Sequence, residues 1–286
     1  MSDPSTEKLL ATAVAAARAG GEVLGRYFRA DDLEVRAKAA HDFVTRADRE
    51  SERAVVGEIR RTFPGHRVLA EEGGLSGAES EYRWLVDPLD GTTNFLQGLP
   101  VFAVSVACQR GGEVVAAAVL DPPGGNLFTA RRGGGARWNG RPMRVSDRPG
   151  LDGAFLATGY PFRSRGALEA YLQVFRDVFL RARSIRRCGA AAVDLAYTAA
   201  GVYDGFFEFR LSPWDFAAGD LLIREAGGRL TDLDGGADFY AGGNLVAGNP
   251  AVHGELLQVV QRHVSEALLD RLDPPAGNKP GGRAVV

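Results

Sequence analysis

The sequence has little cysteine and little net charge, and each shortage argues against certain classes of protein. Its 286 residues include two cysteines, Cys108 and Cys188, which are too few for a disulfide framework and lie in no metal-binding pattern. A formal net charge of −2 gives no reason to expect nucleic acid or a membrane surface as a partner. We therefore expect a protein of the reducing cytoplasm.

Long apolar runs and an export signal are also missing. No stretch reaches the ~18 consecutive apolar residues that a membrane-spanning helix needs. The first residues, Met-Ser-Asp-Pro-Ser-Thr-Glu, are acidic and have no apolar core, so we expect no export. The remaining composition, 45% hydrophobic and 24% charged, is that of an ordinary globular protein. The length suits one large domain or two closely packed halves.

The stretch from Trp84 to Phe95 concentrates residues that hold cations and phosphate. Apolar residues typical of a buried strand end lead into Asp87 and Asp90, and Pro88 between the two acids interrupts both strand and helix. Gly91 lets the backbone approach a ligand, and the next three residues offer N–H groups and hydroxyls to an anion. Carboxylates beside such groups predict metal-assisted phosphate chemistry. A turn that only caps a helix is the plainer alternative.

Further carboxylates stand where ligands collect in α/β proteins. Asp48 lies at the entry of a helix expected to end at Phe63, where a simple first-turn acid is the alternative. Glu71 and Glu72 end a short apolar strand, at the sheet edge where ligands bind. Asp215 follows a proline at the start of another helix, where capping alone is again possible. His41 fits none of these patterns, and we interpret it as a surface histidine.

Two charged features have opposed interpretations. Glu208 stands in an apolar strand, where an unpaired carboxylate is costly. Its partner is therefore either a ligand, such as a polyol hydroxyl or a cation, or the nearby Arg210. Residues 181–187 include four arginines, which form either a solvated face or the rim of a site that attracts an anionic substrate.

The hydrophobic periodicity predicts a mixed α/β protein. A first helix, capped by Asp3 and Pro4, runs to Phe28, and Gly20 and Gly21 either weaken it or let another backbone approach. Further helices are expected around residues 48–63, 171–179, 190–196, 213–226 and 250–264. Strands are expected around residues 67–70, 84–86, 101–108, 114–120, 126–130, 155–158 and 206–209. A tail rich in proline and glycine, 271–286, is expected to be mobile.

The residues Asp-Pro-Leu-Asp-Gly-Thr-Thr-Asn-Phe, 87–95, resemble the signature of the inositol monophosphatase family of Mg²⁺-dependent phosphatases. The resemblance extends over residues 6 to 265. It includes the stretch 38–48, the Glu71-Glu72 pair after Ala70 in place of the family's usual glycine, residues 188–196, and Trp214-Asp215. It implies a layered αβαβα sandwich shared with fructose-1,6-bisphosphatase. An N-terminal half, 1–145, would carry most metal ligands, and a C-terminal half, 146–270, would carry substrate residues and Asp215.

The resemblance also implies roles for individual residues. Two or three Mg²⁺ ions would be held by Glu71, Asp87, the Leu89 carbonyl, Asp90 and Asp215. The catalytic residues would be Asp48, Thr92, Glu71 and Asp90, with Thr92 hydrogen-bonded to Asp48 and orienting a water that attacks phosphorus. The substrate would contact Asp90, Gly91, Thr92, Thr93, Gly189, Ala191, Glu208 and Asp215.

We therefore predict a lithium-sensitive, Mg²⁺-dependent phosphatase that hydrolyses inositol 1-phosphate and acts as a cytoplasmic homodimer. Related sugar phosphates, histidinol phosphate and fructose 1,6-bisphosphate are alternative substrates. The last would need a second phosphate site, supplied by Arg163 or the arginines of 181–187. A non-catalytic binding protein that acts through protein or RNA contacts is an alternative of another class. The sequence does not favour it, because every expected catalytic position is filled.

Overall fold

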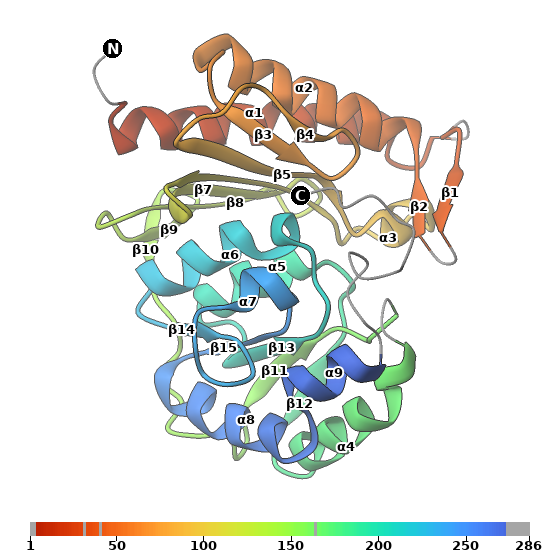
Figure 1. Cartoon of the computed structure of the whole chain (residues 1–286), viewed down its shortest axis with the longest axis vertical. Helices are drawn as coiled ribbons and strands as arrows, with labels where there is room; N and C mark the ends of the chain where they lie inside the picture. The colour runs from red at the N-terminus through yellow and green to blue at the C-terminus, as the bar shows by residue number, and fades with distance from the viewer. Residues whose placement is uncertain (1–3, 31–32, 40–41, 163–164, 273–286) are drawn as a thin grey trace.

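The structure, a computed structural model, describes residues 4–30, 33–39, 42–162 and 165–272. Layers of helices and sheets alternate from one end of the molecule to the other (Figure 1). Three pairs of helices form the helical layers: α1 (Thr6–Tyr27) with α2 (Arg46–Thr62), α5 (Ala191–Ala199) with α6 (Pro213–Glu225), and α4 (Leu168–Phe179) with α8 (Pro250–His263). The αβαβα order expected from the sequence is confirmed.

The first sheet has eight strands in the order β10-β9-β8-β7-β6-β5-β3-β4. The strands are β3 (Arg67–Ala70), β4 (Gly74–Ser76), β5 (Tyr82–Asp90), β6 (Ala103–Arg110), β7 (Glu113–Asp121), β8 (Asn126–Arg131), β9 (Ala136–Trp138) and β10 (Arg141–Met143). Helix α1 covers one face of β6 and β7, and α6 covers the other. The central strands are therefore buried on both faces along most of their length, and apolar residues predominate on both faces instead of alternating with polar ones.

The second sheet has five strands in the order β12-β11-β13-β15-β14. The strands are β11 (Phe155–Thr158), β12 (Ser184–Arg186), β13 (Gly205–Glu208), β14 (Arg229–Thr231) and β15 (Leu245–Gly248). Because β11 and β13 are parallel and in register, their carboxyl ends meet at the same edge. This places Gly159 against Glu208: a Cβ built on the glycine would lie 1.9 Å from the Glu208 carboxyl group.

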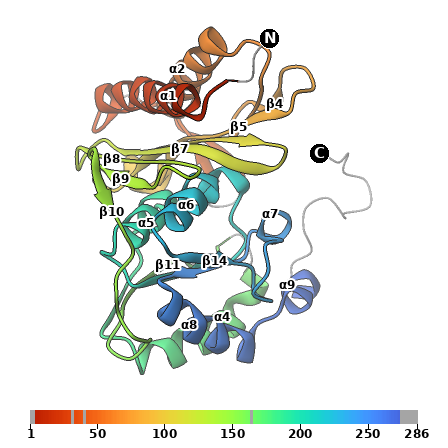
Figure 2. The ribbon, with the colours of Figure 1, turned by 90° about the vertical axis from the view of Figure 1, so that its left-hand side faces the viewer.

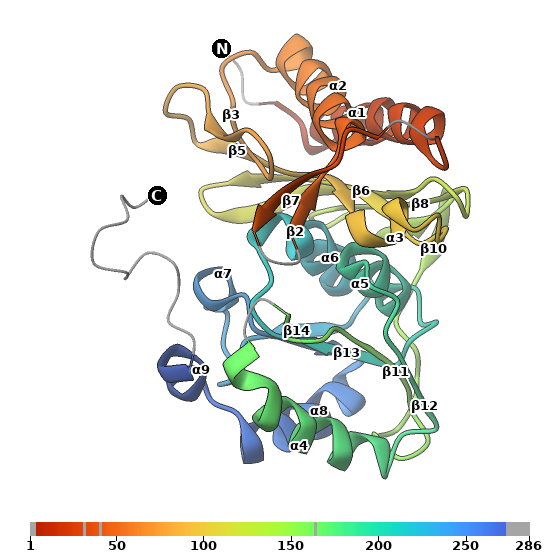
Figure 3. The ribbon, with the colours of Figure 1, turned by 90° about the vertical axis from the view of Figure 1, so that its right-hand side faces the viewer.

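Smaller elements surround these layers. Strands β1 (Arg36–Ala39) and β2 (Asp42–Val44) form a separate hairpin near α3 (Thr92–Leu96) (Figure 3). Helices α7 (Phe239–Gly242) and α9 (Glu266–Leu272) and the 3₁₀ turn Arg165–Ala167 complete the described chain. The sequence predicted none of β1, β2, β12, β14, β15, α7 or α9. Each is short, and several are polar or interrupted by glycine, so their periodicity is weak.

The paired glycines of α1 allow close packing. A Cβ on Gly20 would lie 2.8 Å from Ser51 Oγ in α2, and one on Gly21 would lie 2.5 Å from Leu120 Cδ2 in β7. The glycines thus admit neighbouring side chains, whereas the prediction was that another backbone approaches. The predicted cap is wrong in part, because Ser5 is the N-cap and its side chain accepts a hydrogen bond from the backbone N–H of Lys8. Asp3 lies outside the described residues.

The connection between the two sheets runs down one side of the molecule from β10 to β11 (Figure 2). The division into halves at residue 145 stays a prediction. Residues 271 and 272 of the predicted tail belong to α9, and the rest of it, like His41 and Arg163, lies outside the described residues. No helix in the described part of the chain is both long and apolar enough to cross a membrane.

Candidate active site

The candidate site begins at an irregular end of strand β5. Pairing with β6 is regular as far as Asp87 opposite Ser105, and the next pair is Asp90 opposite Ala103. Between these two pairs β5 advances by three residues and β6 by two, which forms a β-bulge in β5. Pro88, which has no N–H to donate, lies inside this bulge. The hydroxyl of Ser51 in α2 donates a hydrogen bond of 2.8 Å to the Pro88 carbonyl and fixes the bulge from the other layer. The predicted interruption at Pro88 is therefore present.

Burial and mutual repulsion dominate the electrostatics of the acids at this bulge. Asp87 and Asp90 are 2% and 9% exposed. Burial raises the pKa of Asp87 well above its usual value, and the charges of Glu71, Asp90 and Asp215 raise it further. Burial, followed by the charge of Asp215, raises the pKa of Asp90 to about 7. The structure therefore brings these four acids within electrostatic reach of one another, although they come from three separate parts of the sequence.

Backbone N–H groups hold three of these carboxylates. Asp90 accepts hydrogen bonds from Ala191 N at 3.2 Å and Ala192 N at 2.7 Å, at the beginning of α5. Asp87 Oδ1 accepts from the N–H of Leu89 at 3.0 Å. Asp215 accepts from the N–H of Ser212 at 2.8 Å in a capping box at the start of α6. The capping function considered for Asp215 is thus present in the structure.

The hydroxyl of Thr92 lies between two acceptors. Its Oγ1 is 3.2 Å from Asp48 Oδ1 and 3.1 Å from the Leu89 carbonyl oxygen. Asp48 is fully buried, and its other oxygen accepts from the N–H of Thr45 at 2.8 Å, within the capping box of α2. A hydroxyl that donates its one hydrogen bond to Asp48 keeps its lone pairs free to accept a hydrogen bond from a water. The predicted contact between Thr92 and Asp48 is present in the structure.

The turn into α3 is fixed by a glycine and an amide. Gly91 has φ +89°, and a Cβ there would lie 2.9 Å from the Val101 carbonyl oxygen, so only glycine fits. The side-chain amide of Asn94 donates to the carbonyls of Val101 at 2.8 Å and Cys188 at 2.9 Å. We expected residue 94 to help receive an anion, but its amide instead joins α3 to the loop that precedes α5. That contact holds Gly189 against the Asp90 end of β5.

The second sheet contributes Glu208 from the end of β13. Glu208 stands two residues after Phe206, whose side chain packs in the core with α5 and α6, so the two lie on the same face of β13. Burial raises the pKa of Asp194 in α5, and the charge of Glu208 raises it further. Arg210, the competing structural partner, forms an ion pair of 2.9 Å with Asp270, and its backbone N–H donates to Asn244.

The four arginines of 181–187 divide between two environments. Arg181 pairs with Asp152 and Glu255 on the surface, and Arg183 and Arg186 lie over the ring of Phe155. Arg187 instead lies over the rings of Tyr160 and Phe162, and a Cβ on Gly189 would come within 2.7 Å of its guanidinium. The solvated face therefore describes Arg181, whereas the attraction of an anionic substrate by Arg187 stays a prediction. Arg187 alone among these four contacts the loop that carries Gly189.

Comparison with known proteins agrees with this geometry. A profile of the inositol monophosphatase family matches residues 5–265. The chain belongs to the inositol monophosphatase family. It is 47% identical over 268 residues to Nus factor SuhB of Pseudomonas aeruginosa, an alignment that covers 92% of this chain and 99% of the relative. It is 45% identical over 259 residues to inositol-1-monophosphatase of Mesorhizobium japonicum, covering 90% and 97% of the two chains. The crystal structure of extragenic suppressor protein suhB from Bartonella henselae superposes with a TM-score of 0.87 at 41% identity, covering 90% and 99%.

Members of this family are generally metal-dependent, and the residues present suit a hard divalent cation. The donors are all oxygen atoms, which favours Mg²⁺ over zinc. The raised pKa values of Asp87 and Asp90 show that the uncompensated charges are costly, and a cation would relieve that cost. Among the described side chains, no three His, Cys, Asp or Glu residues are close enough to form a ready metal site.

One acid of this family member was overlooked by the sequence reasoning. Asp194, in the first turn of α5, is 1% exposed, and its Oδ1 has no hydrogen-bond partner within the part of the chain that the structure describes. Burial raises its pKa well above the usual value, and the charges of Glu208 and Asp90 add to the effect. The available signal was an aspartate inside an otherwise apolar helix.

Proposed function

We propose that the protein is a Mg²⁺-dependent phosphatase that hydrolyses inositol 1-phosphate to inositol and phosphate. The observation that carries the proposal is the convergence of four acids beside the Thr92–Asp48 hydrogen bond. Burial raises the pKa of Asp87, and the charges of Glu71, Asp90 and Asp215 raise it further, which supports a shared site for the four acids. The similarity to inositol-1-monophosphatase of Mesorhizobium japonicum supports the choice of substrate.

The groups that would hold two or three Mg²⁺ ions are the carboxylates of Glu71, Asp87, Asp90 and Asp215 and the carbonyl of Leu89. Bound there, the ions would supply activation of the attacking water and neutralisation of the phosphate charge. Asp90 is oriented for this work by the two N–H groups of α5, and Asp215 by its capping box. The backbone thus fixes the orientation of these two carboxylates.

The protein's own residues position the water and the phosphate. Thr92, donating to Asp48, would accept a hydrogen bond from the attacking water and so fix its direction toward phosphorus. The backbone N–H groups of Gly91 and Thr92, with the exposed side chain of Thr93, would receive phosphate oxygens. No residue needs to become covalently attached to phosphorus.

The ring of the substrate would lie between the two sheets. Gly189 and Ala191 offer a surface without bulky side chains at the start of α5, and Glu208 would accept hydrogen bonds from ring hydroxyls. Ala190 stands where family members usually have serine or threonine, so this chain makes one fewer hydroxyl contact at that point. Arg187, the arginine nearest to Gly189, is the group that would favour a second phosphate, as in fructose 1,6-bisphosphate.

A phosphate-release assay tests the proposal. The purified chain is incubated with Mg²⁺ and, in parallel, inositol 1-phosphate, histidinol phosphate, fructose 1,6-bisphosphate and 3′-phosphoadenosine phosphate. We expect the highest kcat/KM for inositol 1-phosphate, loss of activity in EDTA, recovery on adding Mg²⁺, and inhibition by Li⁺. The Asp90→Asn variant, purified identically, controls for contaminating phosphatases. A higher kcat/KM for another substrate would refute the assignment, and equal activity in EDTA would refute the metal requirement.

We also propose that the protein is a homodimer in the cytoplasm. Helix α4 and the residue after it expose large apolar side chains: Leu168 at 51%, Leu172 at 44%, Phe179 at 62% and Leu180 at 71%. Such a surface is costly in water unless another chain covers it. Light scattering should give twice the chain mass of 30.5 kDa, and Leu172→Asp should restore the single-chain mass. The unpaired Cys108 and Cys188 fit a reducing compartment.

A second candidate function follows from the names of relatives. The 47% identity to Nus factor SuhB of Pseudomonas aeruginosa makes a binding role of that kind possible for this chain. The two functions separate in a strain of that bacterium that lacks its SuhB. If the Asp90→Asn variant restores growth as well as the unaltered chain does, hydrolysis is not the property needed there. If only the unaltered chain restores growth, catalysis accounts for the role.

A further inference from the structure

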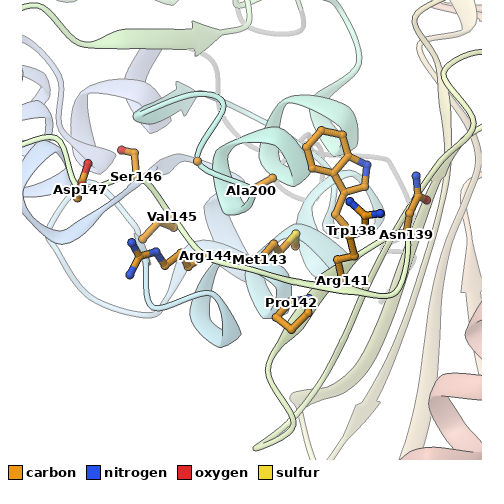
Figure 4. A pocket seen from close by; sticks show the side chains of 11 residues that line it. Trp138, Asn139, Arg141, Pro142, Met143, Arg144, Val145, Ser146, Asp147 and Ala200 are labelled. Carbon is orange, nitrogen blue, oxygen red and sulfur yellow. The ribbon is translucent and has the colours of Figure 1, made fainter.

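A cavity of about 790 Å³ lies away from the acid cluster, where the chain passes from the first sheet to the second (Figure 4). We call it the junction pocket. One wall is the β9–β10 hairpin, another is the connector after β10, and the third is the end of α5 at Ala200 and Gly201. Its volume is in the range of small-molecule sites. It is therefore large enough to accommodate a nucleotide-sized ligand while staying open to solvent.

The wall of the junction pocket is held in place by contacts outside it. Val145 donates its N–H to the Ala226 carbonyl at 3.1 Å, and the Ser146 hydroxyl accepts from Asn249 at 2.9 Å. A Cβ on Gly201 would lie 3.0 Å from the Arg144 carbonyl oxygen, so the end of α5 packs directly against the connector backbone. The pocket is thus preformed by the backbone and needs no closing loop.

The side chains of the junction pocket suit an anion with a ring. Arg141 and Arg144 have no hydrogen-bond acceptor or acidic partner within residues 4–30, 33–39, 42–162 and 165–272, whereas Arg148 just beyond the pocket pairs with Asp204. In Figure 4 the Arg141 guanidinium lies beside the indole of Trp138, and Arg144 extends from the connector at the opposite end. Asp147 is the one acid in the lining of this part of the structure, so its net charge is positive.

We propose that the junction pocket binds an organic phosphate of the nucleoside diphosphate class. The ring would pack on Trp138 and the side chain of Met143, and phosphate oxygens would accept hydrogen bonds from the two guanidiniums. The separation of the arginines along the connector favours an extended ligand over a single phosphate ion. The carboxylate of Asp147 disfavours a ligand with charge at that end and so sets the direction of binding.

Helix α5 joins this pocket to the candidate active site. Trp138 Nε1 donates to Asn126 at 2.9 Å, and Asn126 donates to the hydroxyl of Tyr197 in α5 at 3.1 Å. The other end of α5 donates the N–H groups that hold Asp90. A ligand that shifts Trp138 or Gly201 therefore acts on the helix that orients Asp90. This regulatory consequence rests on the proposed function, whereas binding itself does not.

Calorimetric titration of ADP into the full chain in EDTA tests binding. Without cations the acid cluster repels an anion, so the titration reports the junction pocket. We expect saturable one-to-one binding, weakened about tenfold by Arg141→Ala and again by Arg144→Ala, since each removes a charge-assisted contact of about 1.4 kcal/mol. Arg26→Ala removes the same charge from an exposed position on α1 and should leave the affinity unchanged.

Absence of saturable binding would overturn the proposal, as would equal affinity in the Arg141→Ala/Arg144→Ala double variant. Pyrophosphate that binds as tightly as ADP would overturn the role of the ring. In the presence of Mg²⁺, ADP should change the rate of inositol 1-phosphate hydrolysis by the unaltered chain and not by the double variant. A chain that binds ADP but hydrolyses nothing would refute the proposed function and leave the pocket assignment standing.

Discussion

The two ends of helix α5 differ in nearly every physical respect. At its beginning, two N–H groups bond to the buried carboxylate of Asp90. At its end, Ala200 and Gly201 line the junction pocket, near the exposed Arg141 and Arg144. Both arrangements follow the helix dipole, which favours an acid at the first turn and cations beyond the last. Burial makes the negative charge of Asp90 costly unless a cation balances it. Exposure leaves the positive charges of Arg141 and Arg144 available to a ligand.

The largest effect is expected from removing the charge at the buried end. Asp90→Asn keeps the shape and loses the negative charge that would hold cations, so turnover of inositol 1-phosphate should fall by about 10³-fold or more. The same substitution at the other end, Asp147→Asn, should leave turnover within about twofold, because that residue is exposed and far from the acid cluster. Steady-state kinetics on the two variants measures the contrast. Similar losses in both would show that the ends are not functionally distinct.

A smaller loss is expected from the residue that would orient the water. Thr92→Ala removes the hydroxyl bonded to Asp48 and should lower kcat by about 10²-fold with little change in KM. Thr92→Ser keeps the hydroxyl and should recover most of the rate. If serine were as poor as alanine, the methyl group of Thr92 and not its hydrogen bond would be the essential feature.

Asp194, in the first turn of α5, allows the buried end of the helix to be tested by changing the pH. Asp194 has a raised pKa in the folded chain, so between its usual value of 3.8 and the raised value the folded state binds more protons than the unfolded state. Its ionisation therefore destabilises the fold as pH rises. Asp194→Asn should increase the free energy of unfolding by about 1 to 3 kcal/mol at pH 8 and by less at pH 5. Urea denaturation at both pH values measures this, and an equal gain at both would contradict the assignment.

The smallest effect on stability and turnover is expected from Tyr197, the residue of α5 that contacts Asn126 between the junction pocket and the helix. Tyr197→Phe removes the hydroxyl that accepts from Asn126 and should cost about 1 kcal/mol of stability. The affinity for ADP should change little, whereas the effect of ADP on turnover should diminish. Thermal unfolding, calorimetry and kinetics on this one variant separate the three quantities. An undiminished effect of ADP on turnover would show that the coupling takes another route.

The strongest predictions from sequence were those in which local chemistry and long periodicity agree. Helix α2 ends where Pro64 follows it, and the interruption at Pro88 lies where the strand pattern stops. The family resemblance supplied the contact between Thr92 and Asp48, since no local rule connects residues 44 positions apart. The roles of the metal and substrate residues stay predictions.

Other features depended on tertiary contacts that no single stretch reveals. The amide of Asn94 serves the loop of Cys188, a residue 94 positions away, so its structural role was invisible in sequence. Strand β15 is an interior member of the second sheet but only four residues long, between Asn244 and the helix cap Asn249. Asp194 was equally hard to assess, because an acid in a helix is usually exposed and only the packing of α5 between two sheets buries it.

The glycine at position 159 suggests one way in which the substrate preference of such a protein could change. The backbone of Gly159 is not in the left-handed region, so alanine is permitted there by conformation, and the nearest obstacle is the neighbouring carboxyl group of Glu208. One added methyl group would push that carboxyl group aside while leaving Asp87 and Asp90 in place. In the proposed phosphatase, evolution or an engineer could thus alter which alcohol is accepted without disturbing the acids that would hold the cations.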